Sequence, residues 1–306
     1  MKLNKLMDGL DGRSHKKDNI IPTDIVELDR FIGGLRPGQI YTLAARPCMG
    51  TTTFAITLVR NIAVFGNTPT AFISMEEGEE LIAQRLLKAG VGEKVDVQPL
   101  KVEMDFPEEI EMLEEVGFRL ENNDMLRKAY MQKMKEAPVW IEYAMGMTAE
   151  ELVVRMETLK REHGVKVVVI DKLGWIVTGA GNMEKQMAMM QLLQAADRLG
   201  IAVLMIAGVS RDAEHRIAYR PQISDLRGGY NIESFSSVVM FLYRPEYYCI
   251  FEDEYGRTDG MADLMVAKNK YGSLGTVRLD FRSRASFENR SLLPLNENSY
   301  GVSIFG

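Results

Sequence analysis

Cysteine, histidine and long apolar runs are scarce in this sequence of 306 residues, and each scarcity excludes a class of protein. The two cysteines, Cys48 and Cys249, are too few for a disulfide framework, and a reduced, cytoplasmic setting fits them best. The three histidines have no paired spacing, which argues against a zinc site. No run reaches the roughly 18 apolar residues of a membrane-spanning helix, and the N-terminus lacks the apolar core of a secretory signal. We therefore expect no membrane partner.

Positive charge is also in deficit. The net charge of −6 argues against a protein that coats nucleic acid by bulk electrostatics, so any DNA contact must be local. Much of the acid lies between residues 93 and 136. Apolar residues make up 46% and charged residues 26% of the chain, which is typical of a soluble globular protein large enough for one α/β domain.

Short apolar segments rich in β-branched residues alternate with helical patterns along the first two thirds of the chain. We predict strands over 39–44, 69–74, 138–142, 166–171 and 201–207, and helices over 25–32, 52–64, 77–89, 148–162 and 184–198. This alternation predicts an α/β fold with a central, mostly parallel sheet flanked by helices. Strands near 236–243, 261–268 and 275–282 are joined by loops or hairpins, which indicates antiparallel additions at the C-terminal edge.

The predicted domain occupies residues 19–306. Residues 1–18 are polar and charged, and we expect them to form a flexible N-terminal tail. Residues 90–137 are acidic and have a helical pattern that interrupts the alternation. We interpret this stretch as an insertion on the same domain and not as a separate domain.

The segment Ala45–Thr52 joins a predicted strand to a predicted helix in the manner of a Walker A loop, the phosphate-binding loop of P-loop NTPases. Such a loop reads G-x-x-x-x-G-K-[ST]: backbone N–H groups cradle phosphate, the lysine neutralises β/γ charge, and the hydroxyl binds Mg²⁺. Here Gly50 and the Thr52 hydroxyl remain, whereas Ala45 replaces the first glycine and Thr51 the lysine. The predicted ATP-binding residues are Arg46, Pro47, Cys48, Met49, Gly50, Thr51 and Thr52.

Two carboxylates end predicted strands. Four apolar residues precede Asp171 in the pattern of a Walker B strand, which places a carboxylate where it could hold Mg²⁺ together with Thr52. Buried strands often end in aspartate, so this pattern alone is weak evidence. It indicates a nucleotide site because it follows the Walker A-like loop in the sequence. Glu76, at the tip of another strand, could orient or deprotonate an attacking water. The alternative is that Glu76 and Glu77 are first-turn residues of the next helix, favoured by its dipole.

Several motifs in order resemble the C-terminal ATPase domain of the replicative hexameric DNA helicases of the DnaB family, a RecA-like fold. The resemblance runs from Ile21 to about Phe287. Its motifs are Ile21-Pro22-Thr23, Gly33–Gly38, Ala44–Gly50, Met147–Leu152, Val168–Asp171, Arg220–Arg227, Phe241–Arg244 and Ala267–Lys270. The Arg220–Arg227 run is especially specific, because RecA-like recombination proteins lack it. We expect the chain to correspond to this domain without the amino-terminal collar of the full-length helicases.

The resemblance implies that ATP and Mg²⁺ bind between adjacent subunits of a ring. Three positions depart from the family pattern: Thr51 stands for the P-loop lysine, Gly208 for the phosphate-sensing glutamine and Lys270 for the arginine finger. The finger, like the matching Lys268, would come from the neighbouring subunit. The catalytic positions implied for this chain are Glu76, Asp171, Lys268 and Lys270.

Channel loops of these helicases grip the phosphates of single-stranded DNA. The resemblance therefore implies DNA contacts for Arg211, Arg216, Arg220 and Arg227. The alternative is that these arginines form salt bridges within the chain, to Asp212, Glu214 and Asp225.

Three departures at one phosphate group predict slow or absent hydrolysis with ATP binding retained. Lys172 or Arg46 could compensate for the missing lysine by approaching phosphate from another direction. Two functions remain open. The first is a divergent replicative helicase core that binds ATP and DNA and self-associates into a ring. The second is a catalytically inactive paralogue that docks on an active replicative helicase as loader, inhibitor or regulator.

Overall fold

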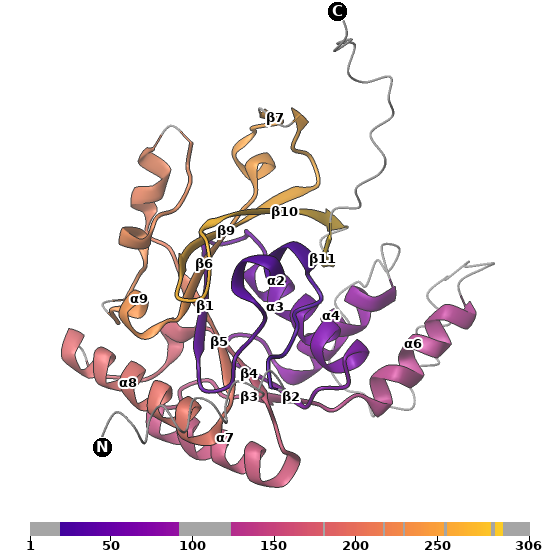
Figure 1. Ribbon diagram of the computed structural model, residues 1–306, viewed down its shortest axis with the longest axis vertical. Helices are drawn as coiled ribbons and strands as arrows, with labels where there is room; N and C mark the ends of the chain where they lie inside the picture. The colour runs from indigo at the N-terminus through magenta and orange to yellow at the C-terminus, as the bar shows by residue number, and fades with distance from the viewer. Residues whose placement is uncertain are drawn as a thin grey trace, which may run out of the picture.

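The computed structural model of the chain describes residues 19–91, 124–179, 181–216, 218–228, 230–253, 256–282 and 285–289. A nine-stranded sheet forms its centre, in the order β11-β10-β9-β6-β1-β5-β4-β2-β3 (Figure 1). The strands are β1 (Ile40–Ala45), β2 (Thr70–Ser74), β3 (Val139–Tyr143), β4 (Val167–Asp171), β5 (Ala202–Gly208), β6 (Val238–Tyr243), β9 (Met261–Asn269), β10 (Gly275–Arg282) and β11 (Ser286–Asn289). From β3 to β6 the neighbours run parallel, whereas β9, β10 and β11 are antiparallel. The predicted fold class is confirmed.

Helices cover both faces of this sheet (Figure 1). They are α2 (Val26–Ile32), α3 (Thr51–Val59), α4 (Glu79–Val91), α6 (Asp124–Glu136), α7 (Ala149–His163), α8 (Asn182–Leu199) and α9 (Ile232–Phe235). Helix α3 continues as a π-helix, η1 (Arg60–Phe65). Short 3-10 turns lie at η2 (Leu173–Trp175), η3 (Arg211–His215), η4 (Ile223–Asp225) and η5 (Pro245–Tyr248), and a small hairpin joins β7 (Glu252–Asp253) to β8 (Gly256–Arg257). Among the described helices, none has the length and apolar character needed to cross a membrane.

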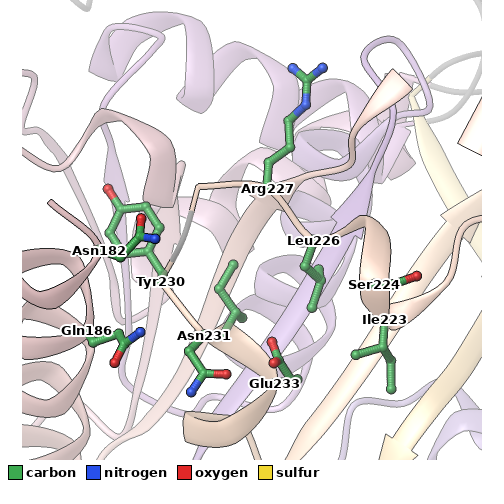
Figure 2. Close-up of a pocket in the computed structure, with 10 residues that line it drawn as sticks. Asn182, Gln186, Ile223, Ser224, Leu226, Arg227, Tyr230, Asn231 and Glu233 are labelled. Atoms are coloured by element: carbon green, nitrogen blue, oxygen red, sulfur yellow. The ribbon is translucent and has the colours of Figure 1, made fainter. Parts of the chain in front are cut away.

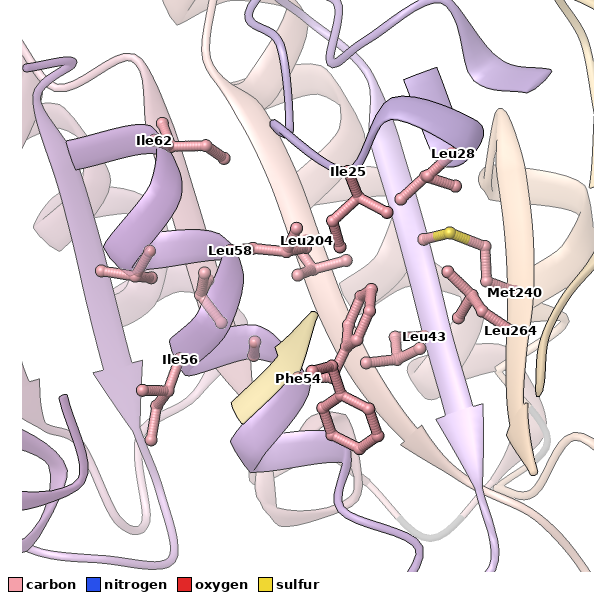
Figure 3. Close-up of a cluster of buried hydrophobic side chains, with 14 of the residues drawn as sticks. Ile25, Leu28, Leu43, Phe54, Ile56, Leu58, Ile62, Leu204, Met240 and Leu264 are labelled. Carbon is pink, nitrogen blue, oxygen red and sulfur yellow. The ribbon is translucent and has the colours of Figure 1, made fainter. Parts of the chain in front are cut away.

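Two separate layers of apolar side chains hold the sheet between its helices. Successive side chains of a strand point to opposite faces, so every central strand contributes to both layers. On β1, Leu43 packs with Phe54 of α3 and Leu28 of α2 (Figure 3). Its neighbour Ala44 belongs to the other layer, with Leu192 of α8. Burial on both faces explains why these strands are continuous apolar runs in the sequence.

The predicted start of the helix over 77–89 is wrong. The helix begins at Glu79, because Ser74 Oγ accepts the N–H of Glu77 at 3.0 Å and turns the chain before the helix. The residues in the first helical turn, next to the positive end of the dipole, are therefore Glu79 and Glu80. Glu76 and Glu77 lie in the connection between β2 and α4.

Helix α6, from the predicted insertion, packs against α4. Tyr130 donates a hydrogen bond to the carbonyl oxygen of Leu86 at 3.1 Å, and its ring lies directly on Gly90. A Cβ atom at Gly90 would be 1.7 Å from Tyr130 Cζ, so this contact requires glycine. Residues 92–123, the larger part of the insertion, and the tail over 1–18 lie outside the described residues.

Candidate nucleotide-binding site

The predicted site residues of β1, β2, β4 and β5 lie at one edge of the sheet. Ala45, the last residue of β1, pairs with Gly208 of β5, and Ser74 of β2 pairs with Asp171 of β4. Because these strands are parallel, their carboxyl ends meet at the same edge, where open α/β sheets bind ligands. The predicted loop, Asp171 and the connection that carries Glu76 therefore border one crevice.

The loop between β1 and α3 has the backbone geometry of an anion cradle. Gly50 precedes the first residue of α3 with φ of 94°, a left-handed conformation that glycine adopts without strain. A Cβ atom at Gly50 would also lie 3.1 Å from Cζ of Phe287, so the position has little room for a larger residue. The first N–H groups of α3 have no partner within the helix, and with the helix dipole they favour an anion.

Asp171 and Thr52 form the polar contact at the centre of the site. Thr52 Oγ1 donates to Asp171 Oδ2 at 2.7 Å. The carboxylate is 2% exposed, and its other oxygen, Oδ1, is buried without a hydrogen-bond partner among the described residues. Burial raises the pKa of Asp171 to about 6, against the opposing effects of the Thr52 hydrogen bond and the Lys172 charge. A buried carboxylate with a partnerless oxygen is a good ligand for a cation.

These two side chains fit Mg²⁺ bound together with a nucleotide. Hydroxyl and carboxylate oxygens are the donors that Mg²⁺ prefers, and Mg²⁺ usually takes one or two carboxylates and completes its shell with phosphates and water. Within the described ranges, no three His, Cys, Asp or Glu residues are grouped to hold a metal by themselves. Thr52 and Asp171 would therefore share the ion with phosphate.

The two cations that could replace the missing lysine have different surroundings. Arg46 is 11% exposed; its Nε contacts Glu214 Oε1 at 2.8 Å, and its NH1 donates to the carbonyl oxygen of Val209 at 3.1 Å. Lys172 is 33% exposed, and its Nζ lies 2.7 Å from Glu76 Oε2. Arg46 is thus held by two partners, whereas Lys172 is held by one half-exposed carboxylate.

Aromatic residues from the C-terminal strands border the loop, and the sequence patterns assigned them no role. The guanidinium of Arg244 lies 4.0 Å from the ring centroid of Phe281, and its NH1 donates to the carbonyl oxygen of Cys48 at 3.4 Å. Phe281 in turn packs on Phe287 with ring centroids 4.6 Å apart. Arg244 belonged to a recognised motif, but only the fold shows that it reaches the loop.

Lys268 and Lys270 lie at the opposite end of the sheet. Lys268 pairs with Val239 near the start of β6, and the N–H of Lys270 donates to Ser237. Ser237 in turn donates to Ile40, the first residue of β1, whereas the loop follows the last residue of that strand. The six residues of β1 span about 20 Å, so neither lysine reaches the loop of its own chain.

The four candidate DNA-contacting arginines fall into two groups. Arg216 forms a two-pronged ion pair with Asp225, at 2.6 and 2.7 Å, and Arg220 contacts Asp263 at 2.7 Å. Arg211 and Arg227 are exposed, and within the described ranges their side chains have no hydrogen-bond or ion-pair partner. Arg227 lies at the rim of a cavity of about 300 Å³ beside the start of α8, and its guanidinium points away from the other lining residues (Figure 2).

Comparison with known proteins agrees with this architecture. Residues 20–289 match the model of the DnaB-like helicase C terminal domain. The chain is 31% identical over 287 residues to the replicative DNA helicase DnaB of Leifsonia xyli subsp. xyli, which covers 92% of this chain and 58% of that protein. It is 28% identical over 282 residues to the replicative DNA helicase DnaC of Bacillus subtilis, which covers 90% and 58%. The chain thus spans little more than half the length of these curated relatives.

Two solved structures share the fold. One, of an ATPase domain, has a TM-score of 0.76 and 22% sequence identity, covering 94% of this chain and 98% of that chain. The structure of a DnaB-like replicative helicase and its interactions with primase also gives a TM-score of 0.76, at 24% identity, covering 94% of this chain and 67% of that chain. With the family model matched from residue 20 to residue 289, the chain belongs to the family of DnaB-like helicase C-terminal domains.

Proposed function

We propose that the chain is the nucleotide-binding core of a DnaB-like replicative DNA helicase, which binds ATP with Mg²⁺ and single-stranded DNA. The contact between Thr52 and Asp171 beside the start of α3 carries this proposal, because it leaves the buried Oδ1 atom without a partner. Curated relatives over 90% or more of the chain are replicative DNA helicases, which supports a role in DNA replication.

Each part of the site has a separate task. The N–H groups at the start of α3 hold phosphate, and Thr52 and Asp171 hold Mg²⁺. Bound MgATP supplies a phosphoryl group that can pass to water. Glu76 would orient that water from the connection after β2. Lys268 and Lys270 would approach from a neighbouring subunit, because they lie at the far end of their own sheet.

Hydrolysis in this chain is slow or absent, since three groups that stabilise the transferring phosphoryl group are changed. Thr51 offers a neutral hydroxyl at the lysine position, and a charge-assisted contact of about 1.5–3 kcal/mol is lost. Gly208 offers no side chain, although among the described residues a Cβ atom there would have only Arg227 Cδ within 4 Å, at 3.9 Å. Lys270 keeps a charge but lacks the planar fork of arginine.

The same three departures favour a second candidate function. A chain that binds nucleotide without turning it over could dock on an active replicative helicase through its family fold, and load, inhibit or regulate that ring. If this second function is correct, the protein should not unwind DNA by itself but should change the rate at which an active DnaB-family helicase unwinds DNA.

An equilibrium titration with a fluorescent ATP analogue, combined with an ATPase assay with and without single-stranded DNA, tests the proposal. We expect Mg²⁺-dependent binding that is lost in the Thr52→Ala, Asp171→Asn double variant and kept in Thr158→Ala, a control on α7. The triple change Thr51→Lys, Gly208→Gln and Lys270→Arg should raise hydrolysis by about 10²-fold or more. Absence of binding would refute the proposal. Turnover of the parent at an ordinary ~1–100 s⁻¹, sensitive to Glu76→Gln, would refute impaired hydrolysis.

A further inference from the structure

The phosphate end of the site carries three carboxylates, and its two glutamates are already paired with cations of the chain, Glu76 with Lys172 and Glu77 with Arg85. Asp171, Glu76 and Glu77 are close enough to interact electrostatically. Burial raises the pKa of Asp171, and the negative charges of both glutamates raise it further. A triphosphate adds several more negative charges, and like charges in a partly buried site repel strongly. Mg²⁺ offsets only part of this repulsion, so retained nucleotide binding requires a protein cation.

Most of the cations near this edge are held by other groups, and Arg227, whose Cδ atom lies beside Gly208, is a candidate DNA contact. Arg46 is fixed by Glu214 and by the carbonyl oxygen of Val209. Arg85 is paired with Glu77, and Arg244 is paired with Glu246 while it packs on Phe281. Moving any of these side chains would break an arrangement that is partly buried.

Lys172 differs from these arginines in its position and in having the most exposed carboxylate partner of the four cations. It directly follows Asp171, and its charge lowers the pKa of that carboxyl group, so the ammonium lies within the field of the proposed Mg²⁺ ligand. Its side chain is held by Glu76 at 2.7 Å, in a pair whose members are 33% and 44% exposed. Such exposed pairs are weakly held, and lysine carries its charge on a flexible stem that can swing to a new partner.

We propose that Lys172 is the phosphate-binding cation of this site and performs the binding role of the absent P-loop lysine. Glu76 holds the ammonium until the β- and γ-phosphates of the nucleotide displace the carboxylate. This inference rests on the proposed nucleotide binding and names the residue that makes it possible without a lysine at position 51. Arrival of the nucleotide thus breaks the Lys172–Glu76 pair and leaves Glu76 free beside the phosphate.

The first test compares affinities of the full chain for a fluorescent ATP analogue with Mg²⁺. Lys172→Ala should weaken binding at least about tenfold, because a charge-assisted contact is lost. Lys166→Ala is the matched control. Lys166 is an exposed lysine that precedes the first residue of β4, whereas Lys172 follows the last. It should change the affinity less than about twofold. Glu76→Gln removes the competing carboxylate and should tighten binding, and this gain should vanish when Lys172→Ala is added.

The second test asks whether the two lysine positions are interchangeable. Thr51→Lys should restore the affinity of Lys172→Ala to near the parent value, and should gain much less when Lys172 is present, a non-additivity expected of groups that share one partner. Lys172→Arg keeps the charge and should retain most of the affinity, and thermal unfolding of each variant checks its folding.

Unchanged or tighter binding by Lys172→Ala would overturn the inference and would mean that Lys172 only restrains Glu76. In that case the Thr52→Ala, Asp171→Asn variant would still lose binding, so the proposed function would stand. A parent chain that does not bind the analogue would overturn both.

Discussion

Arg216 and Arg227 belong to the same candidate DNA-contacting segment, but their side chains have different surroundings. Arg216 neutralises Asp225, whose side chain is 3% exposed, so Arg216→Ala would leave a buried carboxylate unpaired. We expect this variant to lower the free energy of unfolding by about 2–3 kcal/mol. Arg227 is exposed, and Arg227→Ala should change stability by less than about 0.5 kcal/mol.

Measurements of DNA affinity should distinguish Arg227→Ala, the variant that leaves stability almost unchanged. If Arg227 contacts a phosphate, Arg227→Ala should weaken binding to single-stranded DNA uniformly across sequences. The slope of log affinity against log salt concentration should become shallower by about one. Urea unfolding gives the stabilities, and fluorescence anisotropy at several salt concentrations gives the affinities. Normal DNA binding by Arg227→Ala, with a normal salt dependence, would remove Arg227 from the DNA-contacting set.

The buried carboxyl group of Asp171 should make stability depend on pH. Its pKa is raised from 3.8 to about 6, mainly by burial, so the folded chain binds the proton more tightly than the unfolded chain does. The resulting stabilisation is complete below about pH 4 and is lost as the pH rises through 6, by an amount of roughly 3 kcal/mol. Asparagine does not titrate, so the Asp171→Asn variant should not lose stability in this way as the pH rises.

Urea unfolding without Mg²⁺ or nucleotide, from pH 4 to pH 7.5, measures this difference. The free energy of unfolding of Asp171→Asn, minus that of the parent, should rise with pH and level off above about pH 7. A difference that stays flat across this range would show that Asp171 titrates as an ordinary exposed carboxyl group.

At the scale of elements, β11 packs against the loop between β1 and α3 and against α3 itself. Phe287 is fully buried; its ring meets Phe54 of α3 at 5.6 Å between centroids and lies against Gly50. Its N–H donates to Thr57 Oγ1 at 3.1 Å, which ties the strand to the middle of α3. The four-residue strand therefore fixes the start of the helix that would hold phosphate.

Phe287→Ala should create a cavity beneath the loop and lower the free energy of unfolding by about 3–5 kcal/mol. Nucleotide affinity should fall as well, because Gly50 loses the ring against which it packs. Phe251→Ala, whose side chain is 58% exposed, is the matched control and should cost less than about 0.5 kcal/mol. A small cost at Phe287, measured by urea unfolding, would mean that β11 does not brace the loop.

The parallel part of the sheet could be predicted from the sequence because its strands are buried on both faces and read as apolar runs. Helix boundaries were less accessible, since the Ser74 hydroxyl that delays the start of α4 acts through a single local hydrogen bond. The strand β11 was not predicted at all. It is short, and its role depends on Phe287 meeting Phe54, a contact between distant parts of the chain that no local periodicity reveals.

The candidate site shows the same division. Thr52 and Asp171 were recognised because their motifs are local, and the structure brings them to 2.7 Å. The sequence left Arg46 and Lys172 as equal candidates for compensation. The choice between them depends on Glu214 and Glu76, partners that only the folded chain places beside them.

At the scale of the whole molecule, the sheet separates two groups of charged residues that the proposed function assigns to one nucleotide. The loop and Asp171 lie at the carboxyl ends of the parallel strands, and Lys268 lies at the other end, where its ammonium donates to the carbonyl oxygen of Glu233. Burial and the neighbouring charge of Lys270 lower the pKa of Lys268. Because these lysines lie too far from the loop of their own chain, the proposed function requires that a second copy bring its lysines to the loop.

Two complementary variants test this arrangement. Thr52→Ala with Asp171→Asn spoils the loop side and keeps the lysines, whereas Lys268→Ala with Lys270→Ala spoils the lysine side and keeps the loop. If the site forms between subunits, each variant alone should bind the ATP analogue weakly, and an equimolar mixture should recover affinity at the mixed interfaces, where one copy supplies an intact loop and the other intact lysines. Light scattering with a non-hydrolysable nucleotide should show association of the mixture. Binding by the mixture that equals the average of the two variants would mean that each chain binds nucleotide alone and that the lysines at the far end of the sheet serve another partner.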